Sequence, residues 1–393
     1  LVDRSLPEGI ATRLRRRFEV TIDAGPLAGP VTVRTVRRSE VLARHGAHRP
    51  SGLSAARKLV SNSRHRNSLY DWLHDPVDDR AERMDRDLGE AGAAAVLAAS
   101  DINMQELAGI PMRGRHMPLA VLWRPDADPV MITQGDTPGG TTFPTLALAL
   151  DDLVPTGRLL VEADALPCGL AENAALDRRD WCAGDFLLRR WRDQGARADL
   201  AFYIITTRAS RMAIDAALTF AAETLRNGAS LRETDAYAVY RSELHAFFAK
   251  HAPDFAAGRT LTNFHATERT TFPSNAAPFP LKMGQGALKI DAGCLAIGSD
   301  GMMLGCSDIA RTLCLDQEGQ QLYDHFRDGV RDVLNPACST GTRGDTIHRL
   351  ATDHIDDAAN RFVNNKLYRR IGSTGAYPRD VGHLLGRNNL THL

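Results

Sequence analysis

The sequence contains 393 residues, of which 43% are hydrophobic and 24% are charged. This composition excludes an intrinsically disordered chain, and the length favours two domains over one. Lys plus Arg and Asp plus Glu each number 48, so the charge balance argues against nucleic acid or an anionic membrane as a partner. No apolar run approaches the roughly 20 residues that cross a bilayer, and the first residues lack the order of a signal peptide. We therefore expect a cytoplasmic protein.

The first 200 residues show two compositions. Residues 1–75 include a tract rich in Arg, His and Ser, which we interpret as an amino-terminal extension. Residues 76–200 alternate helical and strand patterns, which predicts a small α/β domain. Its expected elements are a helix, turn and strand in 81–100, strands in 118–125, 129–133 and 159–163, and a helix in 185–194.

Residues 201–393 begin with a different pattern. Apolar residues recur at helical spacing from Ser210 to His251 with one polar turn between them, which predicts two long helices. Residues 287–298 and 306–315 are rich in small and β-branched residues and predict two sheet strands. A further helix is expected at 318–334.

Each of these two strands carries one carboxylate, Asp291 in "KIDAGC" and Asp308 in "SDIART". A buried carboxylate costs several kcal/mol unless it is paired, hydrogen-bonded or bound to a metal ion. Two such groups on adjoining strands predict a cation site with oxygen ligands, which suits Mn, Co, Fe, Zn or Mg. An equally open alternative is that either Asp caps a turn or pairs with an arginine such as Arg311.

These two segments resemble the strand pair of the creatinase, prolidase and aminopeptidase P family, in which both aspartates bind metal. The resemblance implies that Asp291 and Asp308 are metal ligands. The segment "DVGHLLGRNNLTHL" resembles the family's histidine motif, which implies that His383 is a third ligand and that His392 transfers protons in catalysis. Residues 99–110 also resemble an amino-terminal turn of the family.

The resemblance implies an α+β protein, with a pita-bread catalytic domain in 201–393 behind the smaller α/β domain. It implies one or two divalent ions (Mn, Co, Fe or Zn) and metal-dependent hydrolysis of a small C–N, amide or X-Pro peptide substrate. It also implies a homodimer or larger oligomer.

The sequence departs from the family pattern in several places. Asn275, Ala276 and Ala277 are followed by Pro278, where the family has a substrate-contacting histidine shortly afterwards. The interval between the two aspartates is longer than usual. The last glutamate is Glu318, so the two glutamates that complete the family's site are expected beyond the residues given. These departures leave open a lyase or hydrolase acting on a non-peptide small molecule, and a metal-free pita-bread protein that binds a partner.

Overall fold

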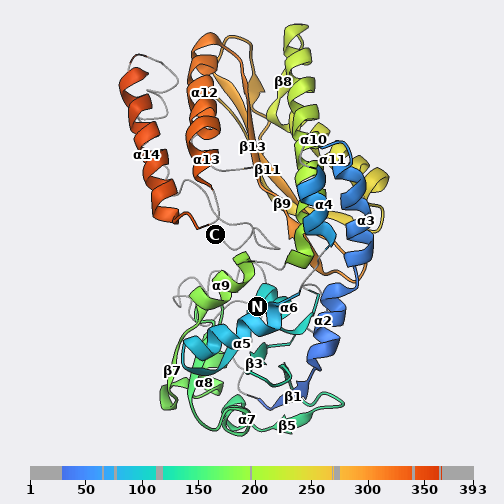
Figure 1. Cartoon of the computed structure of the whole chain (residues 1–393), viewed down its shortest axis with the longest axis vertical. Helices are drawn as coiled ribbons and strands as arrows, with labels where there is room; N and C mark the ends of the chain where they lie inside the picture. The colour runs from blue at the N-terminus through green and yellow to red at the C-terminus, as the bar shows by residue number, and fades with distance from the viewer. Residues whose placement is uncertain are drawn as a thin grey trace, which may run out of the picture. The chain divides into compact units, whose positions relative to one another are not determined.

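The structure is a computed structural model that describes residues 29–63, 66–74, 78–111, 118–194, 197–267, 269, 275–338, 341–362 and 364. The chain divides into two compact units (Figure 1). The first unit contains the residues up to Ala47 together with Asp79–Arg192. The second contains His48–Asp78 together with the residues from Asp193 onwards.

A mixed sheet of seven strands organises the first unit, in the order β5-β1-β4-β3-β2-β6-β7. Its pairings β2 with β6 and β6 with β7 are parallel, and the others are antiparallel. The strands are β1 (Val31–Thr35), β2 (Ala93–Ala98), β3 (Ala120–Trp123), β4 (Val130–Gln134), β5 (Thr141–Phe143), β6 (Arg158–Val161) and β7 (Trp181–Ala183).

Both faces of this sheet are covered. Alternate residues of β2 enter two different cores, Ala95 and Leu97 on one side and Val96 and Ala98 on the other. A strand buried on both faces reads as a continuous apolar run, which explains the sequence "AAAVLA". The helices of this unit are α2 (Arg38–Gly46), α5 (Arg80–Glu90), α6 (Asp101–Ala108), α7 (Leu146–Leu153), α8 (Cys168–Asn173) and α9 (Asp185–Gln194).

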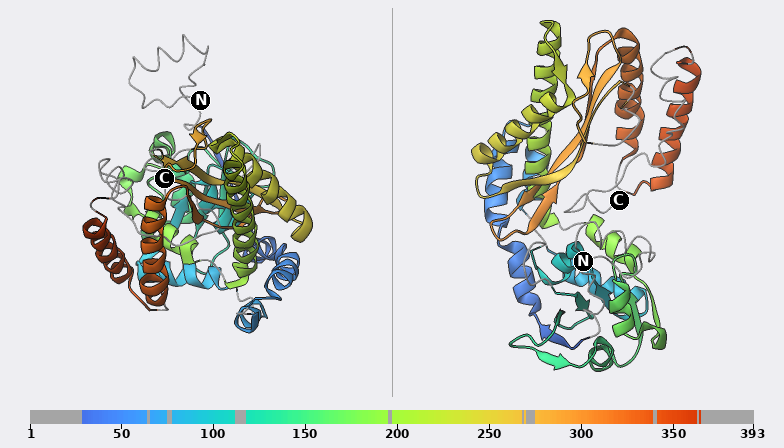
Figure 2. Two further views of the ribbon diagram at one scale, coloured as in Figure 1. Left: turned by 90° about the horizontal axis from the view of Figure 1, so that it is seen from above. Right: turned by 180° about the vertical axis from the view of Figure 1, so that it is seen from behind.

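The second unit is built on two long helices, α10 (Leu200–Arg226) and α11 (Glu233–His251), which lie side by side against one face of a sheet (Figure 2). Strand β11 (Ala287–Ile297) runs through that sheet, with β9 (Ala256–Ala266) on one edge. On its other edge β11 pairs with β12 (Met303–Cys306) and then β13 (Ile309–Cys314). The remaining elements include α3 (Arg49–Val60), α4 (Arg66–His74), β8 (Leu231–Arg232), β10 (Pro280–Leu281), α12 (Gln317–Gly329), α13 (Asn335–Ala337) and α14 (Gly344–Arg361).

The core of the second unit lies between the helix pair and the sheet. Helix α10 presents small buried residues at a spacing of four, namely Ala209, Ala213, Ala217 and Ala221. Small side chains at this spacing form one face of the helix and allow its neighbours to approach closely. Strand β11 contributes every second residue to the same core: Leu288, Ile290, Ala292, Cys294 and Ala296.

Most of the predicted elements are confirmed, with three differences. The first long helix begins at Leu200, ahead of the expected Ser210. The strand expected at 306–315 is interrupted at Ser307 and Asp308, which separate β12 from β13. The helix expected at 318–334 is present, but its last turn, Val330–Leu334, widens to π-helical hydrogen bonding.

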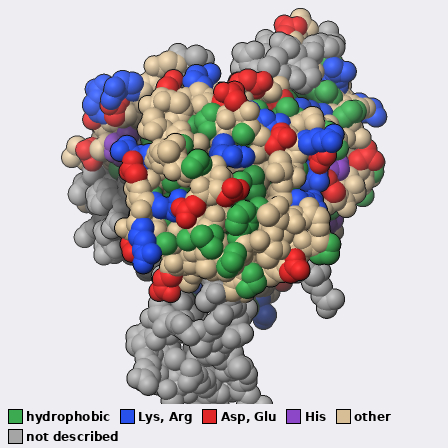
Figure 3. All heavy atoms as spheres, turned by 90° about the horizontal axis from the view of Figure 1, so that it is seen from below, with side chains coloured by type: hydrophobic (Ala, Val, Ile, Leu, Met, Phe, Trp, Pro, Cys, Tyr) green, Lys and Arg blue, Asp and Glu red, His purple; other side chains and the backbone are tan. Residues whose placement is uncertain are grey.

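Charged side chains of both signs lie next to one another on the face shown in Figure 3, in line with the equal numbers of acidic and basic residues. Within the described ranges, no helix has both the length and the apolar character that crossing a membrane requires.

Candidate metal centre

The two predicted carboxylates lie on paired segments of the second unit's sheet. Asp291 of β11 stands directly opposite Ala310 of β13. Asp308 lies two residues before Ala310, at the break between β12 and β13. The pairing has the same register on both sides of this break, which places Asp308 opposite Gly293. The two aspartates are therefore diagonal neighbours on the sheet, a position in which the backbones lie roughly 7 Å apart.

The alternation of β11 determines which face carries Asp291. Residues with even numbers from Leu288 to Ala296 enter the core under the helices, so Lys289 and Asp291 point away from it. The side chain of Asp291 is 28% exposed, whereas Ile290 next to it is fully buried. The same alternation along the facing strand puts Asp308 and Ala310 on the face of Asp291. We call this side the open face.

Gly293 allows the close approach of the two strands at this point. A Cβ atom on Gly293 would lie 1.7 Å from the carbonyl oxygen of Ser307 and 3.2 Å from the Cα atom of Asp308. The register between β11 and β9 also shifts between Ala292 and Cys294. Only glycine fits such a position, so the glycine in "IDAG" has a structural role: it lets the segment bearing Asp308 lie against the strand bearing Asp291.

A buried polar network holds the residue before Asp308. The hydroxyl of Ser307 donates to the carbonyl oxygen of Thr206 at 3.1 Å and lies 2.8 Å from the hydroxyl of Ser210. It also accepts a hydrogen bond from the backbone N–H of Cys294 at 3.2 Å. Burial raises the pKa of the Cys294 thiol to about 11, so this thiol stays neutral and acts in packing. The network fixes the backbone from which Asp308 projects.

Asp291 has two polar partners that sequence reasoning did not name. The ammonium group of Lys289 lies 3.7 Å from Asp291 Oδ2, and Asn263 Nδ2 donates to the same oxygen at 3.3 Å. Arg311, which we considered as a partner for either aspartate, donates to the carbonyl oxygen of Ala310. Lys289 could have been found from the period of two in "KID". Asn263 could not, because its position depends on the long-range register of β9.

The open face extends onto β9. Asn263 stands opposite Asp291, and His265 stands opposite Lys289. Asn263 and His265 are both buried. An imidazole and an amide beside paired carboxylates add donors and acceptors that can orient a ligand. This histidine has no counterpart among the sequence predictions, since an isolated His in "TNFHAT" carries no motif.

The remaining residues considered in the sequence analysis lie away from the two aspartates or outside the described residues. His383 and His392 lie outside the described residues. Asp300, in the stretch that lengthens the interval between the aspartates, accepts a hydrogen bond from the backbone of Met302 in the turn after β11, and His48 Nε2 lies 2.9 Å from its Oδ1. Ala277 precedes the position at which the family has a substrate-contacting histidine and this chain has none. Its backbone N–H donates to the carboxylate of Glu233.

The open face provides some, but not all, of the ligands that a divalent ion needs. Asp291 and Asp308 offer carboxylate oxygens, which are the ligands that Mn²⁺, Mg²⁺ and Zn²⁺ accept. The described part of the chain contains no group of three or more His, Cys, Asp and Glu side chains that could hold a metal ion. The two aspartates therefore fit as one part of a metal site that needs further donors.

Comparison with known proteins shows which sequence profile and which solved structures the chain resembles. Residues 206–392 match the sequence profile of metallopeptidase family M24. This confirms the resemblance predicted from the motifs. No curated protein sequence matches the chain.

Solved structures share the fold over most of the chain. The prolidase from Pyrococcus horikoshii OT3 is similar with a TM-score of 0.53 and 15% identity, over 79% of this chain and 83% of that one. The dipeptidase PepE from Mycobacterium ulcerans gives 0.52 and 16%, over 71% and 76%. Zinc-substituted E. coli aminopeptidase P in complex with product gives 0.50 and 13%, over 80% and 82%. These likenesses show the pita-bread fold.

Proposed function

We propose, from the match of residues 206–392 to the sequence profile of metallopeptidase family M24, that the protein is a metal-dependent hydrolase of a short peptide or small amide. The observation that carries the proposal is the register of the open face. It makes Asp291 and Asp308 diagonal neighbours on the side of the sheet away from the core. Two carboxylates so close repel each other unless a cation lies between them.

In this proposal Asp291 and Asp308 hold one or two divalent ions together with His383, which lies outside the described residues. Such ions, when bound, lower the pKa of a water molecule and polarise the scissile carbonyl group. The chain's own residues position these ligands. Asn263 orients the carboxylate of Asp291 through its amide, and Ser307 fixes the backbone of Asp308. His392 is proposed to transfer protons.

The wider assignments of this proposal follow from the family. We propose that the catalytic domain comprises residues 201–393 and the smaller domain 76–200; within residues 1–75, β1 and α2 belong to the first compact unit and α3 and α4 to the second. A homodimer in the cytoplasm and manganese as the metal are the family's usual properties and stand here as proposals. The family's usual substrate is an X-Pro peptide. The absence of a histidine shortly after Ala277 favours a substrate other than ordinary X-Pro peptides.

A specific observation favours a second candidate, a metal-free pita-bread protein that binds a partner. Lys289 places an ammonium group 3.7 Å from Asp291 and can balance its charge without a metal ion. A charge neutralised within the chain removes the strict need for a bound cation. The two candidates therefore differ in what neutralises the pair of aspartates.

Peptide hydrolysis tests the proposed function. The purified chain is incubated with Mn²⁺, Co²⁺ or Zn²⁺ and a panel of dipeptides and small amides, and released amine is measured. We expect hydrolysis that EDTA abolishes and that Asp308→Asn lowers by about 100-fold or more, because a neutral amide is a poor metal ligand.

The matched control is Asp353→Asn, which alters an exposed carboxylate on α14 and should leave the rate unchanged. If the chain binds no metal ion and hydrolyses none of the panel, the binding-protein candidate replaces the hydrolase.

A further inference from the structure

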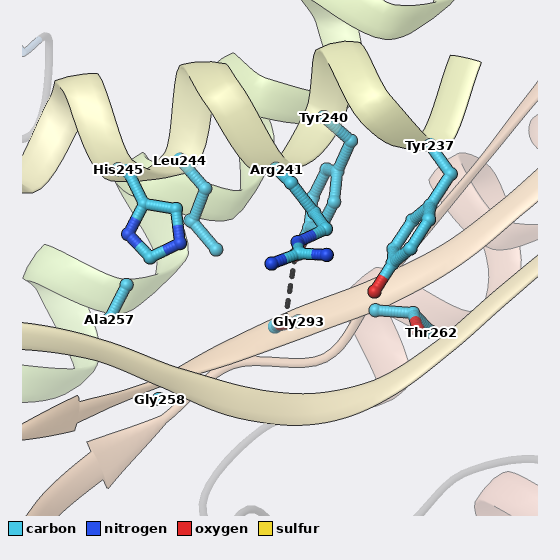
Figure 4. A pocket seen from close by; sticks show the side chains of 9 residues that line it. All are labelled: Tyr237, Tyr240, Arg241, Leu244, His245, Ala257, Gly258, Thr262 and Gly293. Carbon is cyan, nitrogen blue, oxygen red and sulfur yellow. Dashed lines mark hydrogen bonds between the residues drawn. The ribbon is translucent and has the colours of Figure 1, made fainter. Parts of the chain in front are cut away.

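A cavity of about 380 Å³ lies on the other side of the second unit's sheet, between α11 and β9 (Figure 4). Nine residues line it: Tyr237, Tyr240, Arg241, Leu244, His245, Ala257, Gly258, Thr262 and Gly293. Figure 4 shows the side chains of α11 hanging towards the strands, with the two tyrosines and Arg241 on one side and His245 over Ala257 on the other. Its volume lies in the range of small-molecule sites, roughly 300–1,000 Å³.

The lining includes one permanent cation, Arg241, and an imidazole, His245, but no Asp or Glu. Among the described residues Arg241 forms no ion pair, and its guanidinium lies 5.8 Å from the centre of the Tyr237 ring. A guanidinium over an aromatic face remains able to bind a carboxylate through two parallel N–H groups. The cavity therefore selects for an anion.

The aromatic and aliphatic residues of the lining favour an anion that also carries an apolar group. The rings of Tyr237 and Tyr240 are nearly parallel, with 18° between their planes and 6.4 Å between their centres. Leu244 and Ala257 add aliphatic surface, and the hydroxyl of Thr262 is a further polar group in the lining. Arg241 is exposed at the rim, and its one guanidinium can form two parallel hydrogen bonds with one carboxylate, so a single negative charge matches the one arginine of the lining.

A hydrogen bond links the lining of the cavity to the backbone of the candidate metal centre. The hydroxyl of Tyr240 donates to the carbonyl oxygen of Gly293 at 2.8 Å. Burial raises the pKa of Tyr240 well above its ordinary value, so this hydroxyl remains a donor. Gly293 is the residue that stands opposite Asp308. A ligand against Tyr240 is thus one hydrogen bond from the segment that brings the two aspartates together.

We propose that this cavity is a binding site for a small monocarboxylate with a planar apolar group, held by Arg241 against the two tyrosines. The site lies on the core side of the sheet and is separate from the open face. It does not depend on the proposed hydrolase activity.

Calorimetric titration with 3-phenylpropionate tests the site, with 3-phenylpropionamide, acetate and inorganic phosphate as comparison ligands and with EDTA present throughout. We expect 3-phenylpropionate to bind about tenfold more tightly than each of the others, since it alone offers both the charge and the ring. Arg241→Gln should weaken its binding about tenfold, and Tyr237→Ala should weaken it several-fold.

Arg226→Gln is the matched control, because Arg226 is an exposed arginine at the end of α10 that does not line the cavity. Its affinity for the probe should equal that of the wild type. Unchanged affinity in Arg241→Gln, equal loss in Arg226→Gln, or phosphate binding as tightly as 3-phenylpropionate would each overturn the proposal. Circular dichroism of each variant verifies that the fold is retained.

Discussion

Strands β2 and β11 occupy central positions in the two sheets, but they differ in what their faces contact. Alternate residues of β2 enter two apolar cores, so the strand is buried on both sides. One side of β11 enters the core under the helices, whereas its other side, buried at Ala287 and Leu295, carries the partly exposed Lys289 and Asp291. A strand buried on both faces serves the stability of its unit, whereas a strand with a polar face can hold charged groups in a fixed register.

The largest effect is expected at the point where β11 departs most from a regular strand. Gly293→Ala places a methyl group 1.7 Å from a backbone oxygen, so the chain must shift there. We expect the free energy of unfolding to fall by at least about 3 kcal/mol, measured by urea denaturation. Gly344→Ala is the control, because a Cβ atom there meets nothing within 4 Å. A loss below about 1 kcal/mol in Gly293→Ala would contradict the close approach.

A paired carboxylate of the first unit contrasts with Asp291. Asp85 accepts hydrogen bonds from Arg38 at 2.5 Å and 2.9 Å and from Trp123 at 2.8 Å. Burial raises the pKa of Asp85, but these hydrogen bonds lower it more, so the pKa lies below its ordinary value. Asp85 therefore stabilises the fold above the unfolded pKa of about 4, and this contribution is lost as the pH falls through the folded pKa.

We expect Asp85→Asn to lower the free energy of unfolding by about 2 kcal/mol at pH 7, and by progressively less below about pH 4. Asp291→Asn should cost less than about 1 kcal/mol at pH 7 without metal, because the partners of Asp291 within the described residues are a long hydrogen bond and a partly exposed ion pair. Denaturation curves of both variants between pH 3 and pH 7 measure this difference. Equal losses at pH 7 would remove the contrast between the two carboxylates.

An isosteric exchange tests the two kinds of strand face directly. Val96→Thr puts a hydroxyl into a fully buried position of β2 and should cost about 1 to 2 kcal/mol. The reverse change, Thr312→Val, lies on the open face of β13 and should alter stability by less than about 0.5 kcal/mol. Similar losses in the two variants, measured by urea denaturation, would show that the open face is packed like a core.

At Lys289 the main expected effect is on metal binding, and the expected effect on stability is small. Lys289→Met should change the free energy of unfolding by less than about 1 kcal/mol, since its ion pair with Asp291 is partly exposed. Removing the ammonium group should instead strengthen binding of Mn²⁺ by about tenfold, because one positive charge near the ligand is gone. Isothermal titration measures this affinity. Weaker Mn²⁺ binding, or none in either protein, would favour Lys289 as the permanent partner of Asp291.

The sequence predicted those parts of the fold that depend on local pattern. The helix at 185–194 and the strands at 118–125 and 129–133 are found in place because each has a clear period and a Pro or Asp at its end. Asp291 and Asp308 were predicted as metal ligands from the resemblance; the registers on either side of the strand break make them diagonal neighbours, and their role as ligands stays a prediction. Asn263 and His265 were missed because nothing local shows which residues of β9 face them.

The cavity under α11 was also beyond sequence reasoning. Its tyrosines and Arg241 lie in the apolar pattern of a long helix, where they read as ordinary helix residues. These residues line one cavity only because α11 packs on β9 and Tyr240 is hydrogen-bonded to the backbone of Gly293. Motif reasoning therefore found the charged groups of the open face, and three-dimensional packing was needed to find the site behind it.

The most direct test of the central claim is the position of a bound metal ion. Crystals of the protein soaked with Mn²⁺ are measured for anomalous scattering. We predict one or two peaks between the carboxylates of Asp291 and Asp308, within about 2.0–2.5 Å of their oxygens, with the Lys289 ammonium moved away from Asp291. The account is contradicted if saturating Mn²⁺ gives no peak there and Lys289 remains paired with Asp291.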